Sequence, residues 1–213
     1  STFSGCHQLE TMTLPTDYKR IGDYAFADCP IYPELPDGLV EIGAGAMIGY
    51  SRPSVNLPSS LRVIGDSAFM RSNLTSVVIP EGVDSVGIRA FQGCDELHRV
   101  DVPSSLKKIS SGMFGNCWRL TVANLAEGVE EIGPDAFVGT QLNDSLSLPR
   151  SLRKIGSTAF SMCDVMDTIA LPEGVTTIGD QAFSLCGSLT AAMLPSTLTE
   201  VGVSVFYGCE NLK

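Results

Sequence analysis

Apolar residues recur along this chain in a pattern of about 23 residues. Written generically, the pattern is P-x-x-L-x-x-I-G-x-x-A-F-x-x-C-x-x-L-x-x-V-x-L, in which other aliphatic residues replace Leu and Val in some copies. The segment from Pro172 to Leu194 is the clearest copy. A period in this range is the signature of a solenoid, in which stacked turns bury a continuous core that no single turn could form.

Two residue types keep strictly to this pattern. Every Phe occupies one slot, which Met47 fills once, and every Cys lies three residues after such a slot. We therefore expect one solenoid over residues 1–213. Because the chain enters at Ser1 and leaves at Lys213 in the middle of a copy, we expect it to be a segment of a longer protein. The Phe slots are filled at Phe3, Phe26, Phe69, Phe91, Phe114, Phe137, Phe160, Phe183 and Phe206.

Within one repeat, the spacing predicts a short helical turn followed by a strand. The Ala-Phe-x-x-Cys-x-x-Leu stretch at 182–189 places its apolar residues on one face of a helix. Residues 189–194 then alternate as in a strand, which Pro195 ends because proline has no N–H to donate. The chain returns through Ile-Gly, where we expect a tight bend. The result is a strand-rich α/β solenoid of about nine turns of 21–23 residues, with a parallel sheet along one face.

The N-terminal part of the chain departs from this regularity. The spacing between Phe slots shortens from 23 to 21 and 22 residues between Phe26 and Phe91. The same region carries the extra prolines Pro30, Pro33 and Pro53 in or near the expected strands. Proline removes the hydrogen bonds of a strand ladder. We therefore expect the second and third turns to be irregular.

The composition excludes several classes of protein. A hydrophobic fraction of 44% with 18% charged residues is that of a folded chain, and no apolar run is long enough to span a membrane. A net charge of −10 disfavours nucleic acids and anionic lipid surfaces, since both need clustered Lys and Arg. We therefore expect protein or glycan partners, without nucleic-acid binding or membrane insertion.

The motif LPxxLxxIGxxAFxxCxxLxxVxLP, which stands with small departures at 149–172, resembles the BspA-like leucine-rich repeat. The resemblance covers essentially the whole chain. It implies a right-handed solenoid with a parallel sheet, found in secreted or surface-attached proteins of host-associated bacteria and some parasitic protists. It also implies adhesion to host extracellular proteins, such as matrix or plasma proteins, and to other cells. The family has no motif-bound catalytic residues to carry over.

Neither the cysteines nor the histidines indicate chemistry. Seven Cys could form disulfides or bind a metal, but side chains stacked in register point together into the core, which favours small buried thiols. No C-x-x-C pair or nearby His completes a zinc site. His7 and His98 occupy slots outside the core pattern and lack a fixed constellation of acidic or nucleophilic partners. We expect no catalytic residue, no cofactor and no metal.

Charged residues precede Ile in an ordered way. Lysines at 107–108 are followed one turn later by glutamates at 130–131, and these by Arg and Lys at 153–154. Because equivalent residues lie on adjacent rungs, opposite charges should face each other, and each exposed pair should contribute about 0–1 kcal/mol. We expect a structural role for them.

The outward residues of the expected strands are where a partner would bind. They form two columns that begin at Thr11 and Thr13 and vary between turns, whereas the core slots repeat. The C-terminal end of the columns is apolar, which indicates a contact patch. Tyr50 and Tyr207 are alternative aromatic anchors. The candidate partner-binding residues are Tyr32, Glu34, Arg99, Asp101, Asn124, Ala170, Ala191 and Met193.

These features predict a non-catalytic, extracellular or cell-surface module that binds proteins, for adhesion or host interaction, through many weak contacts. A structural spacer that projects another domain is the first alternative, and a uniformly polar sheet would favour it. An enzyme is the second alternative, and it would need a cleft with clustered ionisable groups. The ends of the stack could also pair with each other, which would give end-to-end self-association.

Overall fold

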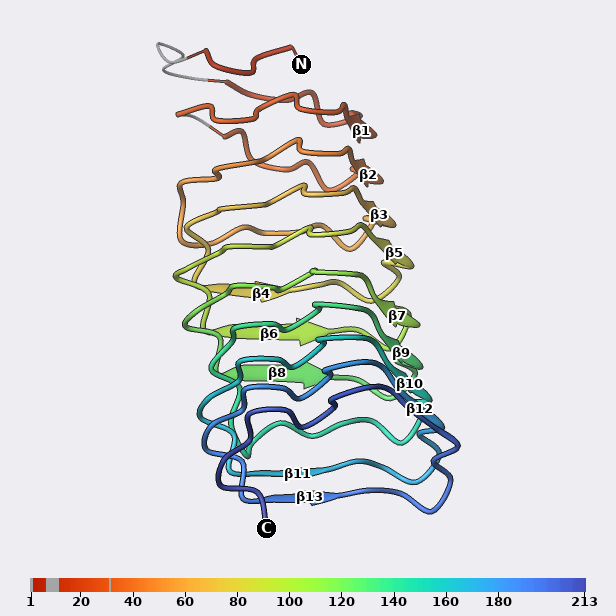
Figure 1. Ribbon diagram of the computed structural model, residues 1–213. Coiled ribbons are helices and arrows are strands. Elements are labelled where there is room, and N and C mark those ends of the chain that lie inside the picture. The colour runs from red at the N-terminus through yellow and green to blue at the C-terminus, as the bar shows by residue number, and fades with distance from the viewer. Residues whose placement is uncertain (1, 7–11, 31) are drawn as a thin grey trace.

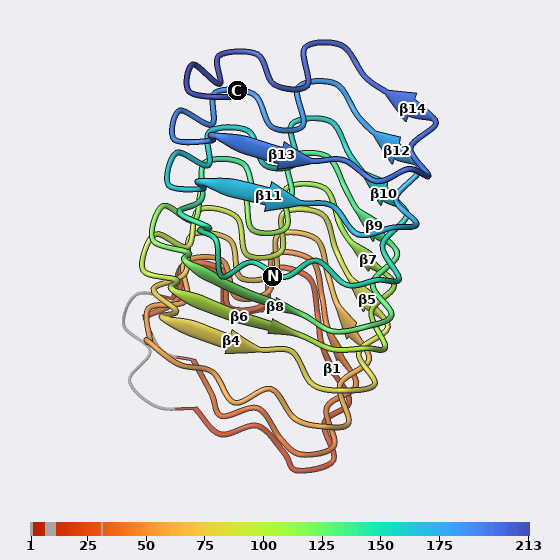
Figure 2. The same cartoon turned by 90° about the horizontal axis from the view of Figure 1, so that it is seen from below.

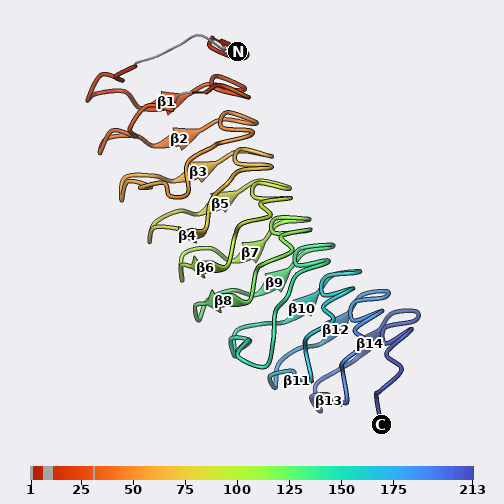
Figure 3. The same ribbon diagram turned by 90° about the vertical axis from the view of Figure 1, so that its left-hand side faces the viewer.

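The computed structural model describes residues 2–6, 12–30 and 32–213, which form a stack of similar turns (Figure 1). Seen from the side, the turns follow one another in order from the N-terminus to the C-terminus (Figure 3). Each turn contributes a two-residue strand, ending at the residue before the Gly slot, to a ladder along one edge that we call the Ile-Gly ladder. Its strands are β1 (Arg20–Ile21), β2 (Glu41–Ile42), β3 (Val63–Ile64), β5 (Ser85–Val86), β7 (Lys108–Ile109), β9 (Glu131–Ile132), β10 (Lys154–Ile155), β12 (Thr177–Ile178) and β14 (Glu200–Val201).

The Ile-Gly ladder consists of a four-stranded sheet, β1-β2-β3-β5, and a five-stranded sheet, β7-β9-β10-β12-β14. Neighbouring strands pair in parallel with equivalent residues side by side, as Ile132 lies beside Ile155. The nine strands bound eight complete turns. The expected solenoid with parallel strands is confirmed, with eight complete turns in place of about nine.

The Ile-Gly ladder is interrupted between β5 and β7, where Ser110 replaces Gly. In intact rungs the Gly N–H donates to a carbonyl of the preceding turn, as Gly87 does to Ile64 O at 2.8 Å. Ser110 reaches the equivalent carbonyl, Val86 O, with its side-chain Oγ instead. The departure from the Ile-Gly pattern therefore coincides with the break in the ladder.

Glycine follows Ile because neighbouring turns approach closely there. A Cβ on Gly156 would lie 2.5 Å from the backbone N of Pro134, and one on Gly179 would lie 2.5 Å from the N of Ser157. Both distances are far below van der Waals contact, and neither glycine has a left-handed φ. These glycines therefore leave room for the adjacent turn, and the bend expected here does not need a left-handed backbone.

A second set of strands lies on another side of the turns (Figure 2). β4 (Ser76–Val78), β6 (Arg99–Val102) and β8 (Val122–Leu125) form one parallel sheet, and β11 (Thr168–Ala170) pairs with β13 (Ala191–Met193). In β11, Ile169 is buried between two exposed residues, as the predicted alternation requires. The strand expected at the end of each repeat is confirmed in the five turns that contain β4, β6, β8, β11 and β13. We call this side the sheet face; it comprises 12–14, 32–36, 54–57, 76–78, 99–102, 122–125, 143–148, 168–170 and 191–193.

The Ala-Phe-x-x-Cys stretch, expected to be helical, is a series of turns, and the described residues contain no helix. Two residues in the clearest copy have left-handed backbones, Gln181 with φ 55° and Leu185 with φ 58°. A left-handed residue cannot continue a right-handed helix. The N–H groups bond to the next turn instead, as Phe183 donates to Val205 O at 3.0 Å. The fold is therefore a β-solenoid, and the α component of the prediction is wrong.

The Phe slots form a column through the core. From Phe69 to Phe206 each ring stacks on the next with centroids 5.3–5.6 Å apart, a favourable separation for aromatic pairs. Beside the column, thiols donate to Phe carbonyls of the preceding turn, as Cys94 Sγ does to Phe69 O at 3.2 Å. Cys6 is exposed and Cys209 is half-buried. The expectation of buried thiols is confirmed at Cys29, Cys94, Cys117, Cys163 and Cys186.

The connections after the sheet-face strands alternate between acid-Gly and Ser-containing types. Glu81 accepts hydrogen bonds from the N–H and the Oγ of Ser104, one turn further on, both at 3.1 Å. In return, the Gly82 N–H donates to Ser105 Oγ at 3.1 Å. We call this reciprocal set of bonds the turn clamp. It recurs between 127–128 and 150–151, and between 173–174 and 196–197.

The expected pairing of charges before Ile is confirmed at one interface between turns. Lys108 Nζ lies 3.0 Å from Glu131 Oε1, and Lys107 Nζ lies 3.9 Å from Glu130 Oε1. On the other side of the glutamates, Arg153 donates to backbone carbonyls of its own turn. The paired side chains are largely solvent-exposed, so each pair contributes little.

The second and third turns are irregular, as the prolines predict. Met47 interrupts the Phe column, and Tyr32 and Tyr50 fill the space with ring centroids 4.5 Å apart. Tyr50 meets Phe69 edge-on, with ring centroids 5.9 Å apart, and so joins the two tyrosines to the Phe column that begins at Phe69. On the sheet face, residues 12–14, 32–36 and 54–57 form no strand.

Candidate functional site

All eight residues expected to contact a partner belong to the sheet face, and seven of them have side chains that are exposed or half-buried. They fall into three groups along the stack: Glu34 in the N-terminal turns, a polar centre on β6 and β8, and an apolar end on β11 and β13. The outward placement of Tyr32 is wrong, because its side chain is 1% exposed and fills the core beside Tyr50. Thr11, expected in the same column, lies outside the described residues.

The polar centre is held by a bidentate ion pair. Arg99 donates from Nε and Nη2 to the two carboxylate oxygens of Asp101, at 3.1 and 2.9 Å, and Asn124 Nδ2 donates to the same carboxylate. Partial burial acts to raise the pKa of Asp101, but the hydrogen bonds from Arg99 and Asn124, with the Arg99 charge, lower it overall. The carboxylate is therefore ionised and already well bonded, and it forms a fixed polar surface.

The C-terminal end of the sheet face is apolar. Pairing of β11 with β13 sets Ala170 beside Met193 and Thr168 beside Ala191. Met193 is 58% exposed, Ala170 is exposed, and Ala191 is half-buried. Contiguous exposed apolar residues rimmed by polar ones mark contact sites more often than single ones do.

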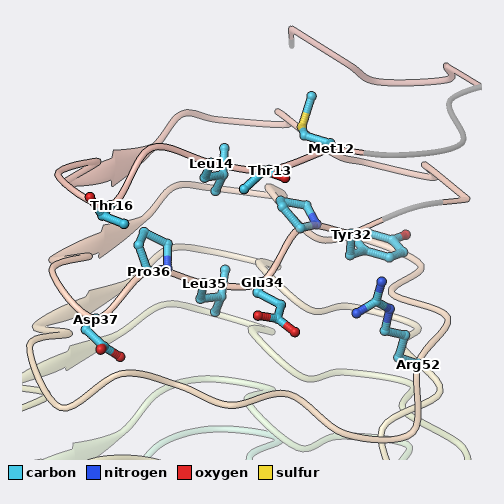
Figure 4. A pocket seen from close by; sticks show the side chains of 11 residues that line it. Met12, Thr13, Leu14, Thr16, Tyr32, Glu34, Leu35, Pro36, Asp37 and Arg52 are labelled. Carbon is cyan, nitrogen blue, oxygen red and sulfur yellow. The ribbon is translucent and has the colours of Figure 1, made fainter.

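A cleft opens on the sheet face between the N-terminal turns (Figure 4). This N-terminal cleft has a volume of about 600 Å³ and is lined by residues 12–14, 16, 32–37 and 52. A hollow of about 320 Å³ adjoins it and shares Glu34, Leu35 and Arg52 with it. Figure 4 shows the Arg52 guanidinium and the Glu34 carboxylate on the same side of the cleft. Binding sites in proteins commonly have volumes of about 300–1,000 Å³.

The sequence-based prediction missed Arg52 and the N-terminal cleft. The signal was present in the short spacing and in Pro33 and Pro53, which predicted the loss of strands. Loss of strand pairing also lets adjacent turns separate, and this separation opens the cleft. Of the alternative aromatic anchors, Tyr50 is buried, whereas Tyr207 is 65% exposed but lies outside the sheet face.

Titratable side chains do not gather into a metal site in the described residues: no group of three or more His, Cys, Asp or Glu is close enough there. His98 is exposed, and His7 lies outside those residues. Burial raises the pKa of the Cys163 thiol to about 11, so this thiol is protonated and unreactive at neutral pH. The same ranges contain no helix with the length and hydrophobicity needed to cross a bilayer.

Comparison with protein families gives one match that spans the chain. A family described as BspA type leucine-rich repeat region, with six copies, matches residues 1–34, 31–144 and 130–213. These segments overlap and together reach from the first residue to the last. Among curated proteins, none matches the sequence significantly.

Solved structures share the fold. A leucine-rich repeat protein from Bacteroides ovatus is 24% identical with a TM-score of 0.61, covering 99% of this chain and 79% of its own. A leucine-rich cell surface protein from Faecalibacterium prausnitzii is 25% identical with the same TM-score, covering 94% and 73%. The pneumococcal vaccine antigen PcpA is 17% identical with a TM-score of 0.51, covering 94% and 70%.

Proposed function

Because this chain belongs to the BspA-type leucine-rich repeat family, we propose that it is a non-catalytic protein-binding module of a bacterial cell surface. Its partner is a protein of the host or of another cell, and the sheet face is the contact surface. Binding requires no reaction; it sums many weak contacts over a long, rigid face.

The observation that carries this proposal is the character of the sheet face. Its core-facing residues repeat from turn to turn, but its outward residues change from an open cleft beside Glu34, through the Arg99 and Asp101 pair, to exposed Met193. A spacer needs only a uniform polar surface. A cleft and an exposed apolar end are features typical of recognition surfaces. The description of the Faecalibacterium prausnitzii relative as a cell surface protein supports the proposed location.

The first experiment measures binding of the chain to a panel of host matrix and plasma proteins. Met193→Glu tests the apolar end, and Ile88→Glu is the matched control, because Ile88 is also exposed but lies outside the sheet face. We expect saturable binding that Met193→Glu weakens and Ile88→Glu does not. Binding to no protein of the panel, with the chain folded and monomeric, would favour the spacer and contradict the proposal.

A further inference from the structure

The two walls of the N-terminal cleft occupy the places of sheet-face strands, but they do not pair with each other. Residues 12–14 and 32–35 occupy successive rungs of the sheet face, where β4, β6 and β8 are paired further along the stack. Within the described ranges, the N–H and C=O groups of 12–14 and 32–35 make no backbone hydrogen bond to a neighbouring turn. Unpaired strand edges are templates for another strand.

The cleft is open on one side and closed on the other. At the Ile-Gly ladder the same two turns stay paired, with Arg20 beside Glu41 and Ile21 beside Ile42. The turns are therefore held together at that edge and separated at the sheet face, where the cleft of about 600 Å³ lies. Insertion of a strand between the two walls requires them to lie about 9.6 Å apart, which is twice the spacing of paired strands.

We propose that the N-terminal cleft binds an extended peptide segment of the partner protein, which adds a strand between 12–14 and 32–35. This inference rests on the proposed function, because it names the chemistry of the partner on the same face. Backbone hydrogen bonds supply affinity in this mode of recognition, and the side chains that line the cleft supply specificity. Leu14 and Leu35 provide the apolar contacts, and Pro33 limits the number of donors on one wall.

The charges of the cleft specify one property of the peptide. Arg52 lines both hollows, as Glu34 and Asp37 do, and no carboxylate of the described residues lies within ion-pair distance of the Arg52 guanidinium. Guanidinium groups bind carboxylates in a bidentate way. The peptide therefore carries an acidic side chain, or its C-terminal carboxylate, at the Arg52 end of the cleft.

The test uses a phage-displayed library of random peptides selected on the intact chain. We expect selected peptides to contain a carboxylate and to lose binding by roughly tenfold or more with Arg52→Ala. The matched control is Arg71→Ala, which removes an equally exposed cation outside the cleft. Equal loss with both variants, or no selected peptide, would overturn the proposal.

A second measurement separates strand addition from other kinds of binding. N-methylation of any residue in the bound segment of a selected peptide should weaken binding, because successive N–H groups of a strand between two partners donate alternately to one wall and to the other. Hydrogen exchange of Thr13, Leu14 and Leu35 should slow when the peptide is bound. Binding that tolerates N-methylation at every position, or protection only on β6 and β8, contradicts strand addition. Such a failure leaves the Met193 result of the host-protein panel unaffected, so the two proposals fail separately.

Discussion

The N-terminal and central turns differ in how neighbouring rungs of the sheet face contact each other. In the central turns β4, β6 and β8 are paired residue by residue, and the Arg99 and Asp101 pair covers them. In the N-terminal turns the equivalent rungs are unpaired and a cleft separates them. The N-terminal turns nevertheless stay stacked through the Ile-Gly ladder, in the sheet β1-β2-β3-β5, and through the core contacts of Tyr50 with Tyr32 and Phe69. The sheet-face ladder is therefore dispensable for stacking, which leaves this face free to diversify.

The core column should show the largest effect. Phe114 is fully buried between Phe91 and Phe137, so Phe114→Ala should lower the free energy of unfolding by about 3–5 kcal/mol in denaturant titrations. Phe114→Met places Met in the Phe slot, as at Met47. It should lower the free energy of unfolding by less than Phe114→Ala does, because Met keeps most of the side-chain volume and loses mainly the two ring contacts. Equal costs for the two variants would mean that stacking, and not volume, sets the stability of the column.

Proline at matched positions tests the difference between the two regions directly. Asn124 lies on paired β8, and Asn56 occupies the same slot of an unpaired rung. Asn124→Pro should destabilise by about 2–3 kcal/mol, because it strains the strand and removes a ladder hydrogen bond. Asn56→Pro should cost less than about 1 kcal/mol. If thermal and chemical unfolding show equal losses, the unpaired description of the N-terminal rungs is wrong.

The close approach at the Ile-Gly ladder should give an intermediate effect. Gly156→Ala places a Cβ against the backbone of Pro134 and should destabilise by about 1–3 kcal/mol. Ser110→Gly should raise the free energy of unfolding, by up to about 1 kcal/mol, because it lets β5 and β7 pair. Hydrogen exchange at position 110 provides the measurement, and faster exchange of that amide in the Gly variant would contradict this account.

Charge reversal at the surface should have the smallest effect. The pairs of Lys107 with Glu130 and Lys108 with Glu131 are exposed, so the double variant Glu130→Lys, Glu131→Lys should cost about 1 kcal/mol or less. The loss should shrink in high salt, because salt screens exposed charges. Melting temperatures in low and high salt test this, and a loss that does not depend on salt would point to packing instead of charge.

Most of the stack could be predicted because the repeat itself carries the information. The slots of Phe, Cys and Ile face the core in turn after turn, so their phase alone gives the buried residues and the position of the sheet-face strands where these form. Irregularity of the N-terminal turns followed from the loss of donors at proline. These features depend on local residue type and on period, both of which a sequence displays.

The features that were missed depend on contacts between turns. The Ala-Phe-x-x-Cys spacing fits a helix, but Gln181 and Leu185 adopt left-handed backbones because their neighbours in the stack accept the N–H groups in between. Tyr32 fits an outward strand position in the sequence pattern, but its side chain is buried in the core against Tyr50. Arg52 shows no pattern of its own, and its place in the cleft follows from the separation of two turns.

The turn clamp bears on how such a chain lengthens during evolution. The acid-Gly connections at Glu81, Glu127 and Glu173 each match the Ser-containing connection of the next turn, and they are spaced 46 residues apart. Duplication or deletion of two turns by unequal recombination preserves every match. A change of one turn would set two acidic connections against each other and would remove the carboxylate that accepts from the exposed N–H groups of the clamp. The heritable unit of this solenoid is therefore the pair of turns, twice the length of its visible repeat.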